Sequence, residues 1–183
     1  MRVIAGSARR LSLVTPKGMD TRPTADKIKE TLFNILAPVI YDTDFLDLFS
    51  GSGGIGIEAL SRGANSATFI ERDKRACECI RKNLETTGFN DRAALYPSDV
   101  LSTLYNLNPP KAFDIVFMDP PFYNDYEKQV LGILRNLDII DENTLIIIEA
   151  GIKTDFSYVK EMGYEITRIK EYKNNEHVFL KKY

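Results

Sequence analysis

Four consecutive residues, Asp119-Pro120-Pro121-Phe122, have the types that chemistry on a ring-bound amino group requires. The two prolines fix the backbone and lack N–H donors, so the nearby carbonyl oxygens are left to accept. The Asp119 carboxylate and the Pro120 carbonyl could then hold both N–H bonds of the amino group and turn its lone pair toward an electrophile. Phe122 could stack on the attached base, which contributes roughly 1–3 kcal/mol. We therefore predict that these four residues are catalytic, mainly by orienting the amino group.

A glycine-rich loop earlier in the chain predicts a binding site for a nucleoside cofactor. Gly51, Gly53 and Gly56 fit the pattern G-x-G-x-x-G, in which the backbone turns tightly and a ligand can approach closely. Glu71, twenty residues after Gly51, stands where an acid can accept hydrogen bonds from ribose hydroxyls. Asp47 suits the ammonium and sulfonium groups of S-adenosylmethionine and would repel a pyrophosphate. The cofactor-binding residues that we predict are Asp47, Gly51, Ser52, Gly53, Glu71, Arg72, Ser98 and Asp99.

These motifs must be positioned by strands and helices, which the hydrophobic pattern predicts from residue 44 onward. The predicted strands are 45–48, 67–70, 93–96, 115–118 and 145–149, and the predicted helices between them are about 54–62, 72–86, 100–107 and 125–136. Short apolar strands that alternate with helices indicate a parallel sheet covered on both faces, with ligands at the carboxyl ends of its strands. Ser98-Asp99 follows the third strand, where Asp99 would either contact adenine or cap the next helix.

The two ends of the chain depart from this alternation. Residues 3–5 predict a short strand, and Thr24 predicts the N-cap of a helix that has an apolar face and ends at Pro38. The short connection between the last two strands requires an antiparallel hairpin. The fold class is therefore α/β, a Rossmann-like doubly wound sheet with an antiparallel C-terminal hairpin, as in Rossmann-like methyltransferases. The elements expected at this end are a helix near 155–162 and strands at 164–172 and 177–182.

Charge divides the chain into unlike regions, although the net charge is only −2. Residues 1–43 carry a net charge of +3, residues 44–150 carry −7, and residues 151–183 carry +2. A basic arm on an acidic body is the pattern of a nucleic-acid contact, although the charge alone is equally compatible with a solvated surface that is basic. We expect residues 1–43 to be a basic extension rather than an independent domain, and residues 44–183 to form a methyltransferase domain. The RNA-binding residues that we predict are Arg9, Arg10, Lys17 and Arg22.

The composition disfavours metal, disulfide and membrane chemistry. Cys77 and Cys79, the two cysteines of the sequence, cannot form the CxxC element of a zinc or redox site, so we expect no metal. No apolar run approaches the ~18 residues that a membrane span needs, and the N-terminus does not resemble a signal peptide. We therefore expect a cytoplasmic protein without membrane contacts. The single histidine, His177, is expected to be structural.

Several longer runs resemble those of one bacterial family. The D-P-P-F motif resembles the signature of methyltransferases that act on amino groups of DNA adenine and RNA guanine. Residues 22–36, 47–53 and 58–64, together with the opening Arg2-Val3-Ile4-Ala5-Gly6, resemble the bacterial 16S rRNA (guanine-N2)-methyltransferases of the guanine 966 type. These are Rossmann-like class I methyltransferases that depend on S-adenosylmethionine. The resemblance covers nearly the whole chain.

This resemblance implies that the chain transfers a methyl group from S-adenosylmethionine to the N2 amino group of a guanine in 16S rRNA. It also implies that the partner is a partly assembled small ribosomal subunit. The turn at 172–177 lacks the glycine of better-known members, which leaves an RNA contact there open. By resemblance, the guanine amino group is held by residues 119–122, and the cofactor is bound by Asp47, Gly51, Gly53, Glu71 and Asp99.

Three other functions are compatible with some of the residues. A DNA adenine-N6 methyltransferase would share the cofactor cleft and the D-P-P-F motif, although 183 residues leave little room for a separate target-recognition region. An NAD-dependent dehydrogenase would explain the glycine pattern but neither the D-P-P-F motif nor Asp47. A non-catalytic assembly factor that binds rRNA would explain only the basic arm.

Overall fold

The structure, a computed structural model, describes residues 1–16, 23–122 and 124–183. Its strands are β1 (Asp44–Leu48), β2 (Ser66–Ile70), β3 (Ala93–Tyr96), β4 (Ile115–Met118), β5 (Leu145–Gly151), β6 (Tyr164–Glu171) and β7 (Asn175–Lys182). Within the described residues they form one sheet in the order β3-β2-β1-β4-β5-β7-β6. Strands β1 to β5 run parallel, and β7 pairs antiparallel with both β5 and β6. The predicted doubly wound sheet with an antiparallel hairpin is confirmed.

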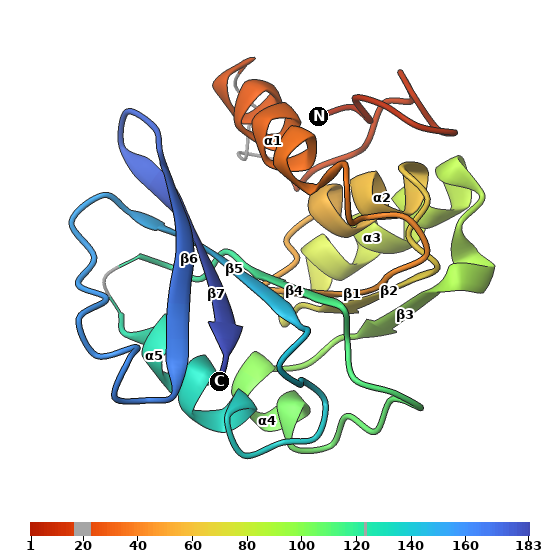
Figure 1. The fold of residues 1–183 in the computed structure, drawn as a ribbon. Helices are drawn as coiled ribbons and strands as arrows, with labels where there is room; N and C mark the ends of the chain where they lie inside the picture. Colours follow the sequence, from red (N-terminus) through yellow and green to blue (C-terminus); the bar gives the residue numbers. More distant parts are fainter. Residues whose placement is uncertain (17–22, 123) are drawn as a thin grey trace.

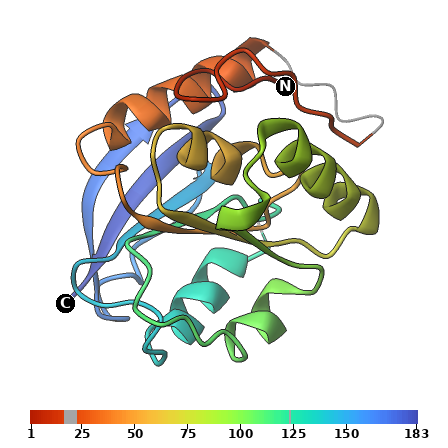
Figure 2. The same cartoon turned by 90° about the vertical axis from the view of Figure 1, so that its right-hand side faces the viewer.

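Helices cover both faces of this sheet. They are α1 (Pro23–Leu36), α2 (Gly54–Ser61), α3 (Lys74–Thr87), α4 (Val100–Leu104) and α5 (Tyr126–Leu134). Helices α1, α2 and α3 lie on one face, and α4 and α5 lie on the other (Figure 1, Figure 2). Because side chains alternate along a strand, Phe45 and Phe117 are buried toward the first group, while Leu46 and Met118 are buried toward the second. None of the helices that the structure describes is long and apolar enough to cross a membrane.

Helix α1 packs its apolar face on the sheet, as predicted, but begins earlier than expected. Its first residue is Pro23, so Thr24 lies inside the helix instead of capping it. Proline is favoured at the first helical position because its missing N–H would have no partner there. Leu32, Phe33 and Leu36 are fully buried in the core that α1 shares with α2 and α3.

Two predicted elements are wrong: the strand at residues 3–5 and the helix near residues 155–162. Residues 3–5 do not form a strand: two of their N–H groups donate to the carboxylate of Glu58. Residues 155–162 form turns instead of a helix. The backbone bonds of this stretch run mostly to the third residue back, from the Val159 N–H to the Phe156 carbonyl and from the Gly163 N–H to the Lys160 carbonyl, so no continuous α-helical ladder forms.

The N-terminal segment is attached to α2 through the fully buried side chain of Glu58. The N–H groups of Ile4 and Ala5 donate to its two carboxylate oxygens at 2.8 and 3.0 Å. The Lys29 ammonium of α1 lies 3.1 Å from the same carboxylate, and the Arg62 guanidinium lies 2.9 Å from it. Burial lowers the pKa of Lys29, and the attraction of Glu58 opposes that shift. One carboxylate therefore joins the N-terminal segment, α1 and α2.

Replacing Glu58 with alanine is expected to lower the free energy of unfolding by about 3–5 kcal/mol, because Lys29 would become an unpaired buried charge. Urea denaturation measures this change. The matched control is Glu78→Ala, which removes an exposed carboxylate from α3 and should change stability by less than about 0.5 kcal/mol. Equal unfolding midpoints for the two variants would contradict the importance of the Glu58 contacts.

Candidate functional site

A cleft of about 930 Å³ opens at the carboxyl ends of the parallel strands. Its walls are the loop after β1, helix α1 and the turn between β6 and β7, and the last two lie side by side in both views (Figure 1, Figure 2). Open α/β sheets bind their ligands at this edge. The cleft contains four residues that the sequence predicted for the site: Asp47, Gly51, Ser52 and Asp119. The structure therefore brings the glycine loop and the start of the D-P-P-F motif together.

Two predicted cofactor-binding acids hold the glycine loop in its conformation. The Asp47 carboxylate, which is 1% exposed, accepts a hydrogen bond from the backbone N–H of Gly56 at 2.9 Å. The Glu71 carboxylate accepts from the backbone N–H groups of Gly51 and Asp73, each at 2.8 Å. Glu71 does not line the cleft itself, so its contact with the loop places it at the edge of the site.

Glycine is needed at the three positions of the loop for different structural reasons. Gly51 has a φ of 55°, and a Cβ built there would meet no atom within 4 Å, so a side chain would enter open space. Gly53 has a φ of 78°, and its Cβ would face the core side chains of Ile80 and Phe69 at 3.2 and 3.3 Å. A Cβ at Gly56 would overlap the Phe69 ring. Ligand access therefore depends on Gly51, whereas Gly53 and Gly56 allow α2 to pack closely on the sheet.

Four acidic residues line the cleft: Asp26 of α1, whose carboxylate lies 3.3 Å from the Arg2 guanidinium, and Asp47, Asp119 and Glu149, which lie on or directly after β1, β4 and β5. Burial raises the pKa of Asp47 to about 7, and the charge of Glu71 adds to this shift. Asp119 opens into the cleft but is crowded by protein, and desolvation followed by the charges of Glu149 and Asp47 raises its pKa well above the usual range. Such a site favours a bound cation, which would relieve the repulsion. Among the described residues, no group of three or more His, Cys, Asp or Glu is arranged to hold a metal ion.

The D-P-P-F motif directly follows β4. Pro120 is buried, Pro121 is exposed and Phe122 is half-buried. The side-chain amide of Asn124 donates to the carbonyls of Pro121 and Phe122 at 3.3 and 3.0 Å, and thereby fixes the turn after the prolines. Asn124 was not predicted, although its place two residues after the motif was a signal for such a role.

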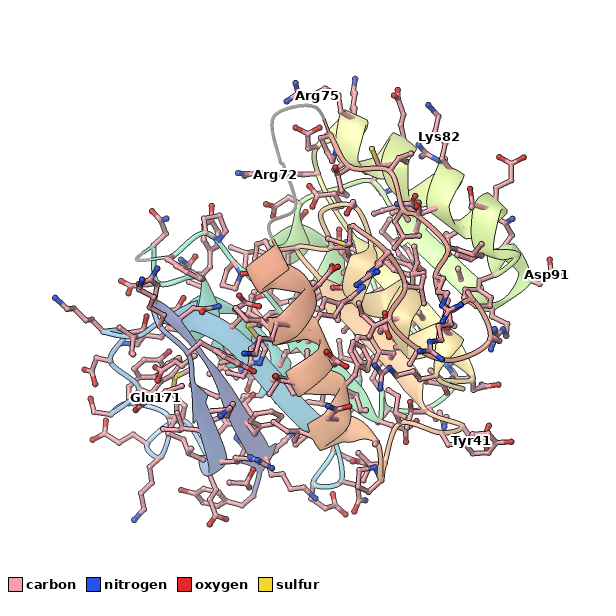
Figure 3. The ribbon with its side chains drawn as sticks, turned by 90° about the horizontal axis from the view of Figure 1, so that it is seen from above. Tyr41, Arg72, Arg75, Lys82, Asp91 and Glu171 are labelled. Carbon is pink, nitrogen blue, oxygen red and sulfur yellow. The ribbon has the colours of Figure 1, made fainter. Side chains whose placement is uncertain are left out.

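Five predicted cofactor-binding residues do not line the cleft: Gly53 and Glu71, which shape the glycine loop, and Arg72, Ser98 and Asp99. Arg72 is exposed at the outer edge of the molecule (Figure 3). Ser98 is exposed, and the Asp99 carboxylate accepts from the backbone N–H of Ser102 at 3.2 Å as the N-cap of α4. Of the two roles that the sequence allowed for Asp99, the structure has the cap of α4. A contact between Asp99 and adenine stays a prediction.

The predicted RNA-binding residues Arg9 and Arg10 do not line the cleft, although Met1, Thr15 and Pro16 of the same N-terminal segment do. Arg9 and Arg10 are exposed, but their segment is bound to the far end of α2, where the N–H groups of Ser7 and Ala8 donate to Ser61 at 2.8 and 3.0 Å. The glycine loop precedes the opposite end of this helix. Two further predicted RNA-binding residues, Lys17 and Arg22, lie outside the described residues.

Lysines from two other elements reach the cleft. Lys27 of α1 and Lys170 and Lys173 of the C-terminal hairpin line it. They come from opposite ends of the chain, so only the folded sheet brings them together. The sequence could indicate that these regions were basic, but it could not indicate that they shared one cleft.

The C-terminal hairpin also contributes residues that were not predicted for the site. Glu149 at the end of β5 and Tyr172, Asn175 and His177 of the hairpin line the cleft. His177 was expected to be structural, and its side chain is indeed only 1% exposed, but it contacts Glu149 in the cleft wall. Glu149 carried a usable signal, because it is an acid at the carboxyl end of a predicted strand, as are Asp47 and Asp119.

Comparison with known proteins identifies the family. The family model described as "Conserved hypothetical protein 95" matches residues 1–181. The chain is 39% identical over 153 residues to "Ribosomal RNA small subunit methyltransferase D" of Escherichia coli, which covers 84% of this chain and 76% of the relative. It is also 39% identical over 152 residues to the protein of that name from Haemophilus influenzae, which covers 81% of this chain and 78% of the relative.

Solved structures agree with this comparison. The structure named "Putative methyltransferase yhhF" from Escherichia coli has a TM-score of 0.84 and 33% identity, and the match covers 100% of this chain and 97% of that one. A structure named SMU.776, solved in complex with SAH, has a TM-score of 0.68 at 19% identity, which shows a shared fold alone. The chain therefore belongs to the family described as Conserved hypothetical protein 95, in which its relatives include the ribosomal RNA small subunit methyltransferases D.

Proposed function

We propose that this chain transfers a methyl group from S-adenosylmethionine to the N2 amino group of a guanine in 16S rRNA, the 966-type guanine, within a partly assembled small ribosomal subunit. The observation that carries the proposal is the position of Asp119, whose carboxyl group opens into the same cleft as the glycine loop. The relatives named ribosomal RNA small subunit methyltransferase D support an RNA substrate.

The residues of the cleft fit S-adenosylmethionine better than a dinucleotide. When bound, this cofactor supplies a methyl group that is activated by a positively charged sulfur. The carboxyl groups of Asp47 and Asp119 attract its ammonium and sulfonium groups but would repel a pyrophosphate. Gly51 leaves the open space that a ligand needs. Each Glu71 carboxylate oxygen accepts one backbone N–H and retains a second lone pair for a ribose hydroxyl.

The D-P-P-F motif orients the target amino group. The Asp119 carboxylate and the Pro120 carbonyl accept its two N–H bonds, and no hydrogen bond to that carbonyl is formed by the part of the chain that the structure describes. The Phe122 ring stacks on the guanine, which adds roughly 1–3 kcal/mol. These contacts direct the nitrogen lone pair at the methyl group, so the protein contributes mainly proximity and orientation.

The direct test is methylation of small subunits isolated from a strain that lacks this protein, followed by mass analysis of the nucleosides. We expect N2-methylguanosine at a single position of the 16S rRNA. Methylated adenine in DNA would instead support a DNA adenine-N6 methyltransferase. Binding to subunits without methyl transfer would support a non-catalytic assembly factor.

Two basic surfaces of the protein contact RNA phosphates. The cleft lysines Lys27, Lys170 and Lys173 contact the target nucleotide and its neighbours, since they line the cleft in which the base must lie. Arg9 and Arg10 are exposed at the far end of α2 and contact more distant phosphates. Each phosphate neutralised by such a cation steepens the salt dependence of binding.

Replacing Asp119 with alanine should lower the rate of methyl transfer on the order of 10²-fold or more, because the amino group loses a positioned acceptor. Calorimetry should show that the variant still binds S-adenosylmethionine. Asp138→Ala, an exposed aspartate after α5, is the control and should leave the rate unchanged. A normal rate for the Asp119 variant would refute the orientation mechanism.

Asparagine tolerates a left-handed backbone, so Gly51→Asn and Gly53→Asn form a matched pair. The side chain at 51 enters the cleft and should weaken S-adenosylmethionine binding by about tenfold or more with little loss of stability. The side chain at 53 meets the core and should lower the free energy of unfolding by about 1–3 kcal/mol. Calorimetry and thermal melts measure the two effects, and the reverse pattern would contradict the placement of the ligand.

The double variants Arg9→Ala/Arg10→Ala and Lys170→Ala/Lys173→Ala each remove two positive charges. Both should lower affinity for the small subunit and flatten its salt dependence by about 0.7 units of slope for each phosphate that is no longer neutralised. Only the lysine variant should also slow methyl transfer within bound subunits, because only its residues line the cleft. Filter binding at several salt concentrations and single-turnover rates separate the two. Normal affinity in either variant would exclude that surface from RNA binding.

A further inference from the structure

Three side chains form a row across neighbouring strands at the floor of the cleft. Met118 of β4 is in register with Ile148 of β5, so the residues that follow them, Asp119 and Glu149, are neighbours. Glu149 is in turn paired with His177 of β7. All three of these polar residues line the cleft. The row therefore extends from the D-P-P-F motif into the C-terminal hairpin.

Hydrogen bonds hold Glu149 at the centre of this row. One carboxylate oxygen of Glu149 lies 3.1 Å from Nε2 of His177, and the other accepts from the side-chain amide of Asn175. The Tyr172 hydroxyl lies 3.0 Å from Nδ1 of His177. Because a carboxylate only accepts, the proton of the neutral imidazole belongs on Nε2, and Nδ1 accepts from the tyrosine. The buried imidazole therefore links the hairpin to Glu149 and fixes where the Glu149 carboxylate lies.

The electrostatic surroundings of the row are mixed. Desolvation, then the charges of Glu149 and Asp47, raises the pKa of Asp119. Burial, followed by the charge of Glu149, raises the pKa of Tyr172 to about 12, and Arg168 opposes this shift. The other charged groups that line the cleft with the row are Asp26, Lys27 and Lys29 from α1 and Lys170 and Lys173 from the hairpin, of which Lys170 is paired in register with His177.

We propose that Asp119 and Glu149 act as a pair that accepts the proton lost by the target amino group, and that His177 is the positioning residue that holds Glu149 in this pair. The inference rests on the proposed function. As the nitrogen lone pair forms the bond to the methyl carbon, the carbon–sulfur bond breaks and its electrons stay on sulfur. The N–H proton then passes to the carboxyl pair and from there to water, so charge and atoms balance.

Two neighbouring carboxyl groups suit this task better than one. A lone exposed aspartate has a low proton affinity, whereas like charges close together raise the proton affinity of the pair. Glu149 cannot move away from Asp119 to relieve that repulsion, because His177 and Asn175 both donate to it. The hairpin thus maintains the basicity of the acceptor.

The test is the rate of methyl transfer in single turnovers as a function of pH. Glu149→Gln keeps the shape of the side chain but cannot take a proton, so the rate should fall on the order of 10²-fold at neutral pH. Loss of a neighbouring negative charge lowers the pKa of Asp119, so the acid limb of the profile should move to lower pH. Glu171→Gln removes an exposed charge from the same hairpin (Figure 3) and should change neither rate nor profile. An unchanged rate and profile for Glu149→Gln would overturn the proposal.

Two variants of His177 test its positioning role, and this test does not depend on whether the Glu149→Gln variant folds. Glutamine at position 177 retains an N–H donor for Glu149, whereas leucine fills similar space without one. His177→Leu should slow methyl transfer by about tenfold to 10²-fold, and His177→Gln should restore most of the rate. Equal rates in the two variants would overturn the positioning role. If the unmodified protein fails to methylate subunits, the proposed function fails; if it methylates them and these variants match it, only this inference fails.

Discussion

Glu58 carries a negative charge into the core, where donors from three parts of the chain neutralise it. The N-terminal segment supplies backbone N–H groups, α1 supplies Lys29, and the residue after α2 supplies the Arg62 guanidinium. Helix α2 begins at the glycine loop, and α1 forms one wall of the cleft. The parallel sheet alone would leave this edge open. The shape of the cleft therefore depends on one buried, fully paired carboxylate.

Charge is arranged in opposite senses at the floor and walls of the cleft. Its floor contains the carboxyl groups of Asp47, Asp119 and Glu149, while lysines from α1 and the hairpin line its walls. A guanine nucleotide that enters with its amino group first has the complementary arrangement, because N–H donors lead and the phosphate follows. A protein with a net charge of −2 can thus attract RNA locally while its acidic interior accepts a cationic cofactor.

The sequence was a good guide wherever local chemistry determines structure. Strand β4 is buried and apolar throughout and the other parallel strands have apolar centres, so all five could be predicted within two residues of their observed ends. Asp47 and Asp119 could be predicted as cleft residues because each lies at or next to a strand end. Prediction failed where the partner is distant in the chain: residues 3–5 give their N–H groups to Glu58, and Glu149 meets His177 only through the pairing of β5 with β7.

The position of β7 between β5 and β6 has a consequence for the order of events during protein synthesis. Strand β6 leaves the ribosome before β7, but it is joined to the sheet only through β7, which pairs with β5. The β6–β7 hairpin is a local pairing, whereas β5 is separated from β7 by the whole of β6, so the β5–β7 pairing is the slower one and β5 exposes its edge meanwhile. The nascent chain can complete the parallel sheet and the glycine loop while the hairpin wall is still missing. The wall that contains Tyr172, Asn175 and His177 is therefore in place only when β7 has paired with β5.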